Sequence, residues 1–170
     1  GEGLEVKLYA LVFFAPAMST RICFGLGAFQ LGGHAVVLQP GKDAWPIEFN
    51  LGTVMDGDTE EHIAEVAQVL GRYVDLIGVR AFPKFIDWAY DREDVVLKSF
   101  QKYSPVPVIN METITHPCQE LAHVLALQEH FGTSDLRGKK YVLTLTYHPK
   151  ALNTAVANSA LTIATRMGMD

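Results

Sequence analysis

Hydrophobic and polar positions along the chain alternate between two kinds of pattern. Short apolar runs rich in β-branched residues predict strands at residues 6–14, 34–38, 76–79, 106–111 and 141–147. Apolar residues at helical spacing predict helices at residues 20–31, 63–70, 91–103, 117–125 and 153–167. Strands that alternate with helices are typical of a parallel sheet, so we predict an α/β fold with helices on both faces of the sheet.

Local signals mark the ends of several predicted helices. The pair Gly32–Gly33 ends the first helix, and Pro117 fits the first turn of another, where its missing N–H has no cost. Asp58 and Glu61 resemble a capping box for the helix that starts near residue 63. The helix after Pro117 is predicted to bury the face made by Cys118, Leu121, Ala122 and Leu125.

The predicted elements divide the chain into two parts. Residues 1–134 hold four strand–helix units and a loop at 40–58, a length that is usually functional or disordered. After the polar connection at 135–140, one further strand–helix pair follows in residues 135–170. One such pair cannot make a domain. It therefore packs on the first sheet, packs on a partner, or begins a second domain.

Composition narrows the class of protein. The chain has 170 residues, of which 49% are hydrophobic and 19% charged, the ordinary balance of a soluble globular protein. A net charge of −5 argues against nucleic acid or an anionic membrane as the main partner. The apolar run at residues 8–18 is too short to cross a membrane, and Glu2 and Glu5 are unlike the basic start of a signal peptide, so we predict a cytoplasmic protein. Cys23 and Cys118 have no metal-site spacing and are predicted to be small buried hydrophobes.

Polar residues follow the predicted strands at their carboxyl ends, where open parallel sheets bind ligands. They are Ser19, Thr20 and Arg21 after the first strand, Arg80 after the third, and Glu112, Thr113, Thr115, His116 and Gln119 after the fourth. Arginines beside helix N-termini suit a small, strongly anionic ligand. His116 could donate to a carbonyl oxygen on which charge develops, and Gln119 could hold an amide. The same residues could also be ordinary helix caps and rim charges, and the pattern alone does not decide.

Two motifs carry a resemblance to a known family. The run His116-Pro117-Cys118-Gln119 resembles the His-Pro-x-Gln motif of the aspartate and ornithine transcarbamylases, and residues 13–24 resemble their phosphate loop. From residue 27 to 170 the chain is most similar to one branch, the N-acetylornithine carbamoyltransferases. The stretches that carry this similarity are residues 45–50 and 110–113.

The resemblance implies an activity and a set of partners. In this family carbamoyl phosphate binds first, and the amine of an N-acetylornithine-like amino acid attacks its carbonyl carbon. The products are a carbamoylated amino acid of arginine biosynthesis and inorganic phosphate. The resemblance further implies a homotrimer and implies that no metal, no cofactor and no covalent intermediate takes part. Acetyl and succinyl substrates are left open.

The resemblance also assigns roles to residues. Arg80 and His116 are implied to be catalytic and to polarise the carbonyl, while Gln119 holds the carbamoyl amide. Thr20 and Arg21 are implied to face the phosphate.

Three more residues receive roles in the same way. Glu112 is implied to contact the amino-acid substrate, and Glu60 to lie near its acyl group. Trp45 is implied to reach across a subunit boundary into the carbamoyl-phosphate site of a neighbour. Their plainer readings are a packing anchor for Trp45 and a helix-dipole partner for Glu60. His123 and His130 lie seven and fourteen residues after His116, and we interpret this stripe as a solvated helix face rather than a metal site.

The chain departs from the family at the phosphate loop. Ser19-Thr20-Arg21 is two positions out of register, so Ala17 stands where the family has its loop serine and Ser19 where it has its first arginine. Leu145 stands where the acetylornithine branch has tryptophan, and the family has a complete second domain beyond the stretch that ends here at Asp170. Two hypotheses follow, an enzyme of weak or no activity and a non-catalytic scaffold that keeps the fold and the trimer contact.

Overall fold

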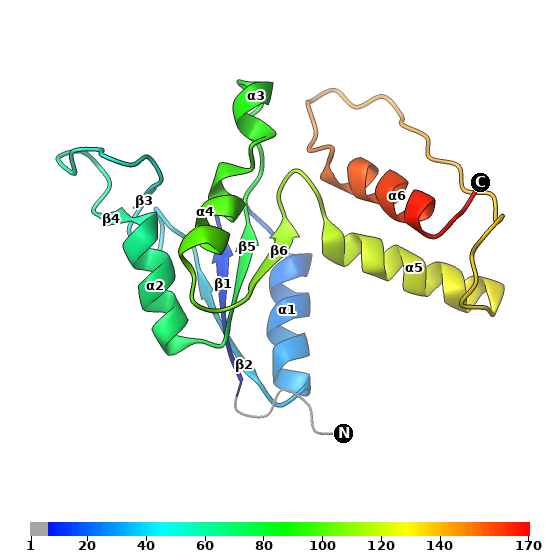
Figure 1. Cartoon of the computed structure of the whole chain (residues 1–170), viewed down its shortest axis with the longest axis horizontal. Helices are drawn as coiled ribbons and strands as arrows, with labels where there is room; N and C mark the ends of the chain where they lie inside the picture. The colour runs from blue at the N-terminus through cyan, green and yellow to red at the C-terminus, as the bar shows by residue number, and fades with distance from the viewer. Residues whose placement is uncertain (1–6) are drawn as a thin grey trace.

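A computed structural model describes residues 7–170 as a parallel sheet with helices on both faces and a pair of helices at its edge (Figure 1). The four strands lie in the order β2-β1-β5-β6 and all pair in parallel. They are β1 (Leu8–Phe13), β2 (His34–Leu38), β5 (Leu76–Arg80) and β6 (Val108–Glu112). The predicted α/β class is therefore confirmed. Val6, the predicted start of the first strand, lies outside the described residues.

Strand β1 is buried on both faces from Ala10 to Phe13, where every residue is apolar. Side chains alternate along a strand, so Ala10 and Val12 join one core cluster while Leu11 and Phe13 join the other. The first cluster lies under α2 (Ile63–Tyr73) and α4 (Val95–Tyr103), and the second lies under α1 (Ser19–Gln30). A strand covered on both faces reads as a continuous apolar run, which is the pattern that predicted it.

The long loop between β2 and α2 contains a small sheet of its own. Its strands β3 (Ile47–Glu48) and β4 (Glu61–His62) pair in parallel. The predicted capping box of Asp58 and Glu61 is wrong, because this pairing keeps Glu61 extended. His62 caps α2 instead, with its Nδ1 accepting a hydrogen bond from the backbone N–H of Ala64 at 3.1 Å.

The helix predicted for residues 91–103 is two helices, α3 (Trp88–Asp91) and α4. Asp94 between them has a left-handed conformation with φ of 50°, which a continuous helix does not allow. The buried carboxylate of Asp91 accepts hydrogen bonds from the backbone N–H groups of Lys84 and Phe85, at 2.8 and 2.9 Å. The preceding loop therefore wraps around that carboxylate, and α3 ends at it.

Beyond the sheet, α5 (Pro117–Phe131) packs against α6 (Ala155–Arg166), and the chain between them loops outward and returns (Figure 1). The strand predicted at residues 141–147 is wrong. A strand needs a neighbour for its backbone hydrogen bonds, and none of the described strands lies beside this segment. The last helix therefore packs on α5 and does not extend the first sheet.

Two predictions of burial also fail. None of the α5 residues is buried, and Leu121 and Leu125 on the predicted inner face are 68% and 57% exposed. Cys23 is exposed on α1, whereas Cys118 is half-buried. The buried face of α6 consists of small residues, namely Ala155, Ser159, Ala160 and Ala164.

We expect replacement of Gly71 by alanine to destabilise the fold although alanine favours helices. A Cβ at Gly71 in α2 would overlap Cγ and Cδ of Pro105, atoms of a ring that is not the end of a flexible side chain. Overpacking of this kind costs about 1–3 kcal/mol, more than the helix-propensity gain of about 1 kcal/mol. Chemical denaturation would measure the change. Gly25→Ala in α1 is the matched control, because nothing lies within 4 Å of its Cβ, and it should stabilise the protein.

Candidate functional site

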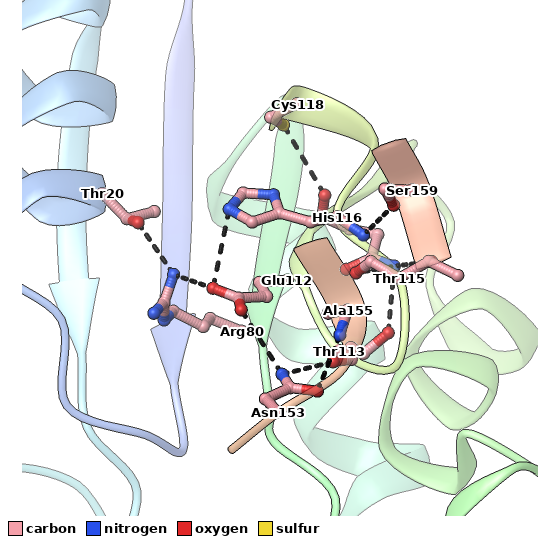
Figure 2. Close-up of polar contacts among 11 residues, drawn as sticks. Thr20, Arg80, Glu112, Thr113, Thr115, His116, Cys118, Asn153, Ala155 and Ser159 are labelled. Carbon is pink, nitrogen blue, oxygen red and sulfur yellow. Dashed lines mark hydrogen bonds and ion pairs between the residues drawn. The ribbon is translucent and has the colours of Figure 1, made fainter. Parts of the chain in front are cut away.

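Four side chains converge at the carboxyl ends of β5 and β6 (Figure 2). Arg80 is the last residue of β5, Glu112 is the last residue of β6, Thr20 lies in the first turn of α1, and His116 is the N-cap of α5. Nη1 of Arg80 lies 2.6 Å from Oε2 of Glu112 and donates to Oγ1 of Thr20 at 2.8 Å. Nε2 of His116 lies 3.5 Å from the same Oε2 of Glu112.

The strand register explains why Arg80 and Glu112 meet. Residues 77 to 79 of β5 pair with residues 108 to 110 of β6, and the register then shifts so that Arg80 lies opposite Glu112. An irregularity of this kind re-aims the side chains that follow it. The shift therefore places a guanidinium and a carboxylate side by side at one edge of the sheet.

The ion pair is largely removed from water. The side chains of Arg80 and Glu112 are 11% and 9% exposed. Pairing offsets the cost of removing two charges from water, so neither side chain is stable there without the other. The guanidinium also lies over the ring of Phe82, with 4.7 Å between its carbon and the ring centroid. Its Nε is buried and has no hydrogen-bond partner among the described residues.

The imidazole of His116 is held in its neutral form. Burial lowers the pKa of His116, an effect that Glu112 opposes and that Arg80 reinforces. A neutral imidazole donates from only one of its two ring nitrogens. With Nε2 protonated, it donates toward the point that Glu112 Oε2 now occupies.

Two residues of the site come from the segment at α6. The side-chain amide of Asn153 donates to Oε1 of Glu112 at 3.3 Å and to the carbonyl of Thr113 at 2.9 Å. The hydroxyl of Ser159 accepts a hydrogen bond from the backbone N–H of His116 at 2.7 Å (Figure 2). Sequence reasoning missed both residues. The available signals were the position of Asn153 at a predicted helix start and the place of Ser159 among alanines.

The other predicted site residues line separate hollows or, like Gln119, contact the four through the backbone. Trp45 and Glu60 line a separate cavity of about 460 Å³, and Trp45 is 57% exposed. Arg21 lies near the ring of Phe13 and lines another hollow together with Lys42. Gln119 is half-buried in the first turn of α5, where its backbone N–H donates to the carbonyl of His116 at 3.0 Å. The structure therefore brings together Thr20, Arg80, Glu112 and His116.

Two other kinds of feature are absent from residues 7–170. In this range His, Cys, Asp and Glu side chains nowhere gather in groups of three that could hold a metal ion. Over the same residues, each helix is too short or too polar to cross a membrane.

Replacement of Glu112 by glutamine should destabilise the protein by about 3 kcal/mol, because it leaves the buried guanidinium of Arg80 without a counter-charge. Urea denaturation would measure the loss. Asp135→Asn is the matched control, since Asp135 forms an equally short pair of 2.7 Å with Arg137 at an exposed position. Exposed pairs contribute little, so the control should change stability much less. Equal losses in the two variants would contradict the burial argument.

The free energy of unfolding should decrease as the pH is lowered, because of His116. Its pKa is lowered in the folded protein, so the unfolded chain binds that proton at a higher pH than the folded chain. The contribution of His116 is complete above the ordinary imidazole pKa of about 6.5 and is lost as the pH falls below it. His116→Gln should reduce the slope of unfolding free energy between pH 7 and 5 by at most about 1.4 kcal/mol per pH unit. His148→Gln controls for loss of an imidazole as such, and an unchanged slope in His116→Gln would refute the prediction.

The sequence and the fold were compared with known proteins. Residues 2–129 match the family described as aspartate/ornithine carbamoyltransferase, carbamoyl-P binding domain. The whole chain is 87% identical to the N-acetylornithine carbamoyltransferase of Xanthomonas axonopodis pv. citri (strain 306), of which it covers 50%. It is 38% identical over 154 residues to the N-succinylornithine carbamoyltransferase of Bacteroides thetaiotaomicron, covering 90% of this chain and 48% of that protein.

The structural comparison finds the same kind of relative as the sequence comparison. The chain superposes with a TM-score of 0.98 and 87% identity on the crystal structure of acetylornithine transcarbamylase complexed with acetylcitrulline. The match covers 100% of this chain and 51% of that one. The chain thus spans about half the length of the N-acetylornithine carbamoyltransferases that it matches. The resemblance seen in the sequence is confirmed, and the chain belongs to the aspartate/ornithine carbamoyltransferase family, whose carbamoyl-P binding domain its residues 2–129 match.

Proposed function

We propose that this chain binds carbamoyl phosphate for transfer of the carbamoyl group to the amine of N-acetylornithine. The identity of 87% to N-acetylornithine carbamoyltransferases, against 38% to an N-succinylornithine carbamoyltransferase, supports the acetylated substrate. In this proposal the chain takes part in arginine biosynthesis and works in the cytoplasm.

One observation carries the proposal, namely that Arg80 and His116 converge on a single oxygen atom. Oε2 of Glu112 lies 2.6 Å from Nη1 of Arg80 and 3.5 Å from Nε2 of His116. It marks the point at which an oxygen is within reach of a buried cation and a neutral imidazole. The carbonyl oxygen of carbamoyl phosphate would take this point, where both donors stabilise the charge that develops during attack.

The proposed reaction is a direct transfer of the carbamoyl group to the amine. The amine nitrogen forms a bond to the carbonyl carbon, the bond from that carbon to the phosphate oxygen breaks, and the amine proton leaves with the phosphate. The carboxylate of Glu112 would hold the incoming amine once the carbonyl oxygen lies between Arg80 and His116. Because Arg80 and His116 are already fixed in a buried site, little reorganisation is required when charge appears on the oxygen.

The phosphate would lie at the start of α1. Thr20 and Arg21 are in the first turn of that helix, whose free N–H groups favour an anion, and Gln119 would hold the carbamoyl amide. Ser19, the first residue of α1, is exposed and uncharged where the family has an arginine. We therefore propose that this chain binds the phosphate weakly and has little turnover.

The loop after β2 would complete the site of a neighbouring copy in a homotrimer. Trp45, Leu51 and Val54 on this loop are 57%, 71% and 73% exposed, an unusual concentration of apolar side chains on a surface. Glu60 lines the same cavity as Trp45 and would lie near the acyl group. Residues 135–170 would begin the amino-acid-binding domain.

Calorimetric titration with carbamoyl phosphate, and separately with inorganic phosphate, would test the proposal. The chain should bind both ligands. Arg80→Met should raise the dissociation constant of carbamoyl phosphate at least about tenfold, the equivalent of 1.4 kcal/mol. Ser19→Arg should lower the dissociation constants of both ligands by about tenfold or more, because it restores a hydrogen-bond donor at the phosphate.

Met18→Arg is the matched control for charge. Met18 is 77% exposed and adjacent to Ser19, so the variant adds the same charge outside the family's register. An equal gain in affinity for the two variants would show that the added charge, and not its position at residue 19, causes the effect. Binding that is indifferent to Arg80→Met would overturn the proposed function.

A further inference from the structure

The loop between β6 and α5 has almost no hydrogen bonds within itself. It comprises residues 113–116, from the end of β6 at Glu112 to the start of α5 at Pro117. One backbone hydrogen bond lies within it, from the N–H of Thr113 to the carbonyl of Thr115 at 2.9 Å. A loop held by so few bonds of its own has many accessible conformations. What fixes this loop must therefore come from other parts of the chain.

Side chains at α6 supply three of the bonds that the loop receives from outside, while Asn110 and Asp94 bond Thr113 and Thr115. Asn153 donates to the carbonyl of Thr113 at 2.9 Å, and Asn158 donates to the carbonyl of Ile114 at 3.1 Å. Ser159 accepts from the backbone N–H of His116 at 2.7 Å. Three of the four loop residues are thus bonded by side chains that follow them by about forty positions.

The packing of α6 makes these bonds possible. Its buried face is formed by small residues, with Ala155 and Ala160 at 0% and 2% exposed, so the helix axis can approach α5 and the loop closely. Ser159 is 1% exposed on this face. A buried hydroxyl that accepts from a buried N–H costs stability when either partner is removed, because the other is left unsatisfied.

We propose that Ser159 is a positioning residue which, with Asn153 and Asn158, fixes loop 113–116 and so sets where the imidazole of His116 lies relative to Arg80 and Glu112. Ser159 touches no reacting atom and acts only through the backbone of His116. Asn153 adds a direct bond to Oε1 of Glu112 at 3.3 Å, so α6 holds both ends of the loop. The catalytic meaning of this placement rests on the proposed function, whereas the placement itself can be measured without ligand.

The imidazole itself reports the position of the loop. It faces Glu112, Arg80, His123 and Glu120, and burial is the main reason that its pKa is low. A loosened loop would admit water to the ring and so reduce that effect. A loss of stability alone, without movement of the loop in the folded protein, would leave the titration of the ring unchanged.

Ser159→Ala in the full 170-residue chain is the decisive variant. The Cε1–H signal of His116, followed by NMR from pH 8 to 4.5 without ligand, should titrate about half a unit or more above its midpoint in the parent chain. His116→Gln identifies the signal by its absence. Carbamoyl phosphate should also bind at least threefold more weakly to Ser159→Ala.

Thr165→Ala is the matched control, because the hydroxyl of Thr165 donates to the carbonyl of Leu161 within α6. It removes a hydroxyl from α6 without touching the loop and should leave the His116 midpoint unchanged. Should Ser159→Ala fail to fold, Asn158→Ala at an exposed position replaces it and should shift the midpoint in the same direction.

The outcomes separate this inference from the proposed function. An unchanged His116 midpoint in folded Ser159→Ala, or in Asn158→Ala where Ser159→Ala does not fold, would overturn the positioning role whatever the ligand does. A shifted midpoint in a protein whose parent chain fails to bind carbamoyl phosphate would instead remove the proposed function and leave the positioning role in place.

Discussion

The buried ion pair between Arg80 and Glu112 is the constraint on which the rest of the site depends. The two charged groups lie 2.6 Å apart and about nine-tenths removed from water, and further hydrogen bonds to each of them offset the cost of burial. Thr20 on α1 accepts a hydrogen bond from the guanidinium, and the side-chain amide of Asn153 donates one to the second carboxylate oxygen. The pair therefore ties α1 and the segment before α6 to the ends of β5 and β6.

Much of this arrangement could be predicted from the sequence because it follows from local pattern. Apolar runs of strand length end at Arg80 and just before Glu112, and parallel strands bring their carboxyl ends to one edge. Pro117 fixes the start of α5, so His116 had to lie at that edge as well. These rules need only neighbours in sequence, and four of the residues that they selected, Thr20, Arg80, Glu112 and His116, lie together in the structure. The roles given to the predicted site residues all stay predictions.

The failures have a common physical origin in partners that are distant in sequence. Whether residues 141–147 form a strand depends on a neighbouring strand, and whether Glu61 starts a helix depends on its pairing with Ile47. The left-handed Asp94 lies beside Asp91, whose carboxylate is held by a loop that no periodicity describes. Asn153 and Ser159 were missed for the same reason, because their partners lie some forty residues earlier.

The limits of the matched domain are therefore not the limits of the site. The family match ends at residue 129, yet Glu112 and the backbone of His116 are bonded by Asn153 and Ser159. A reaction that stabilises charge on one oxygen needs its donors fixed to within a fraction of an ångström. Without Asn153 and Asn158, the carbonyls of Thr113 and Ile114 would need water as their hydrogen-bond donor. The loop would then lose the conformation that sets the position of the imidazole. Loss of the bonds from α6 to the loop thus acts on His116, although α6 lies outside the residues 2–129 that match the family's domain.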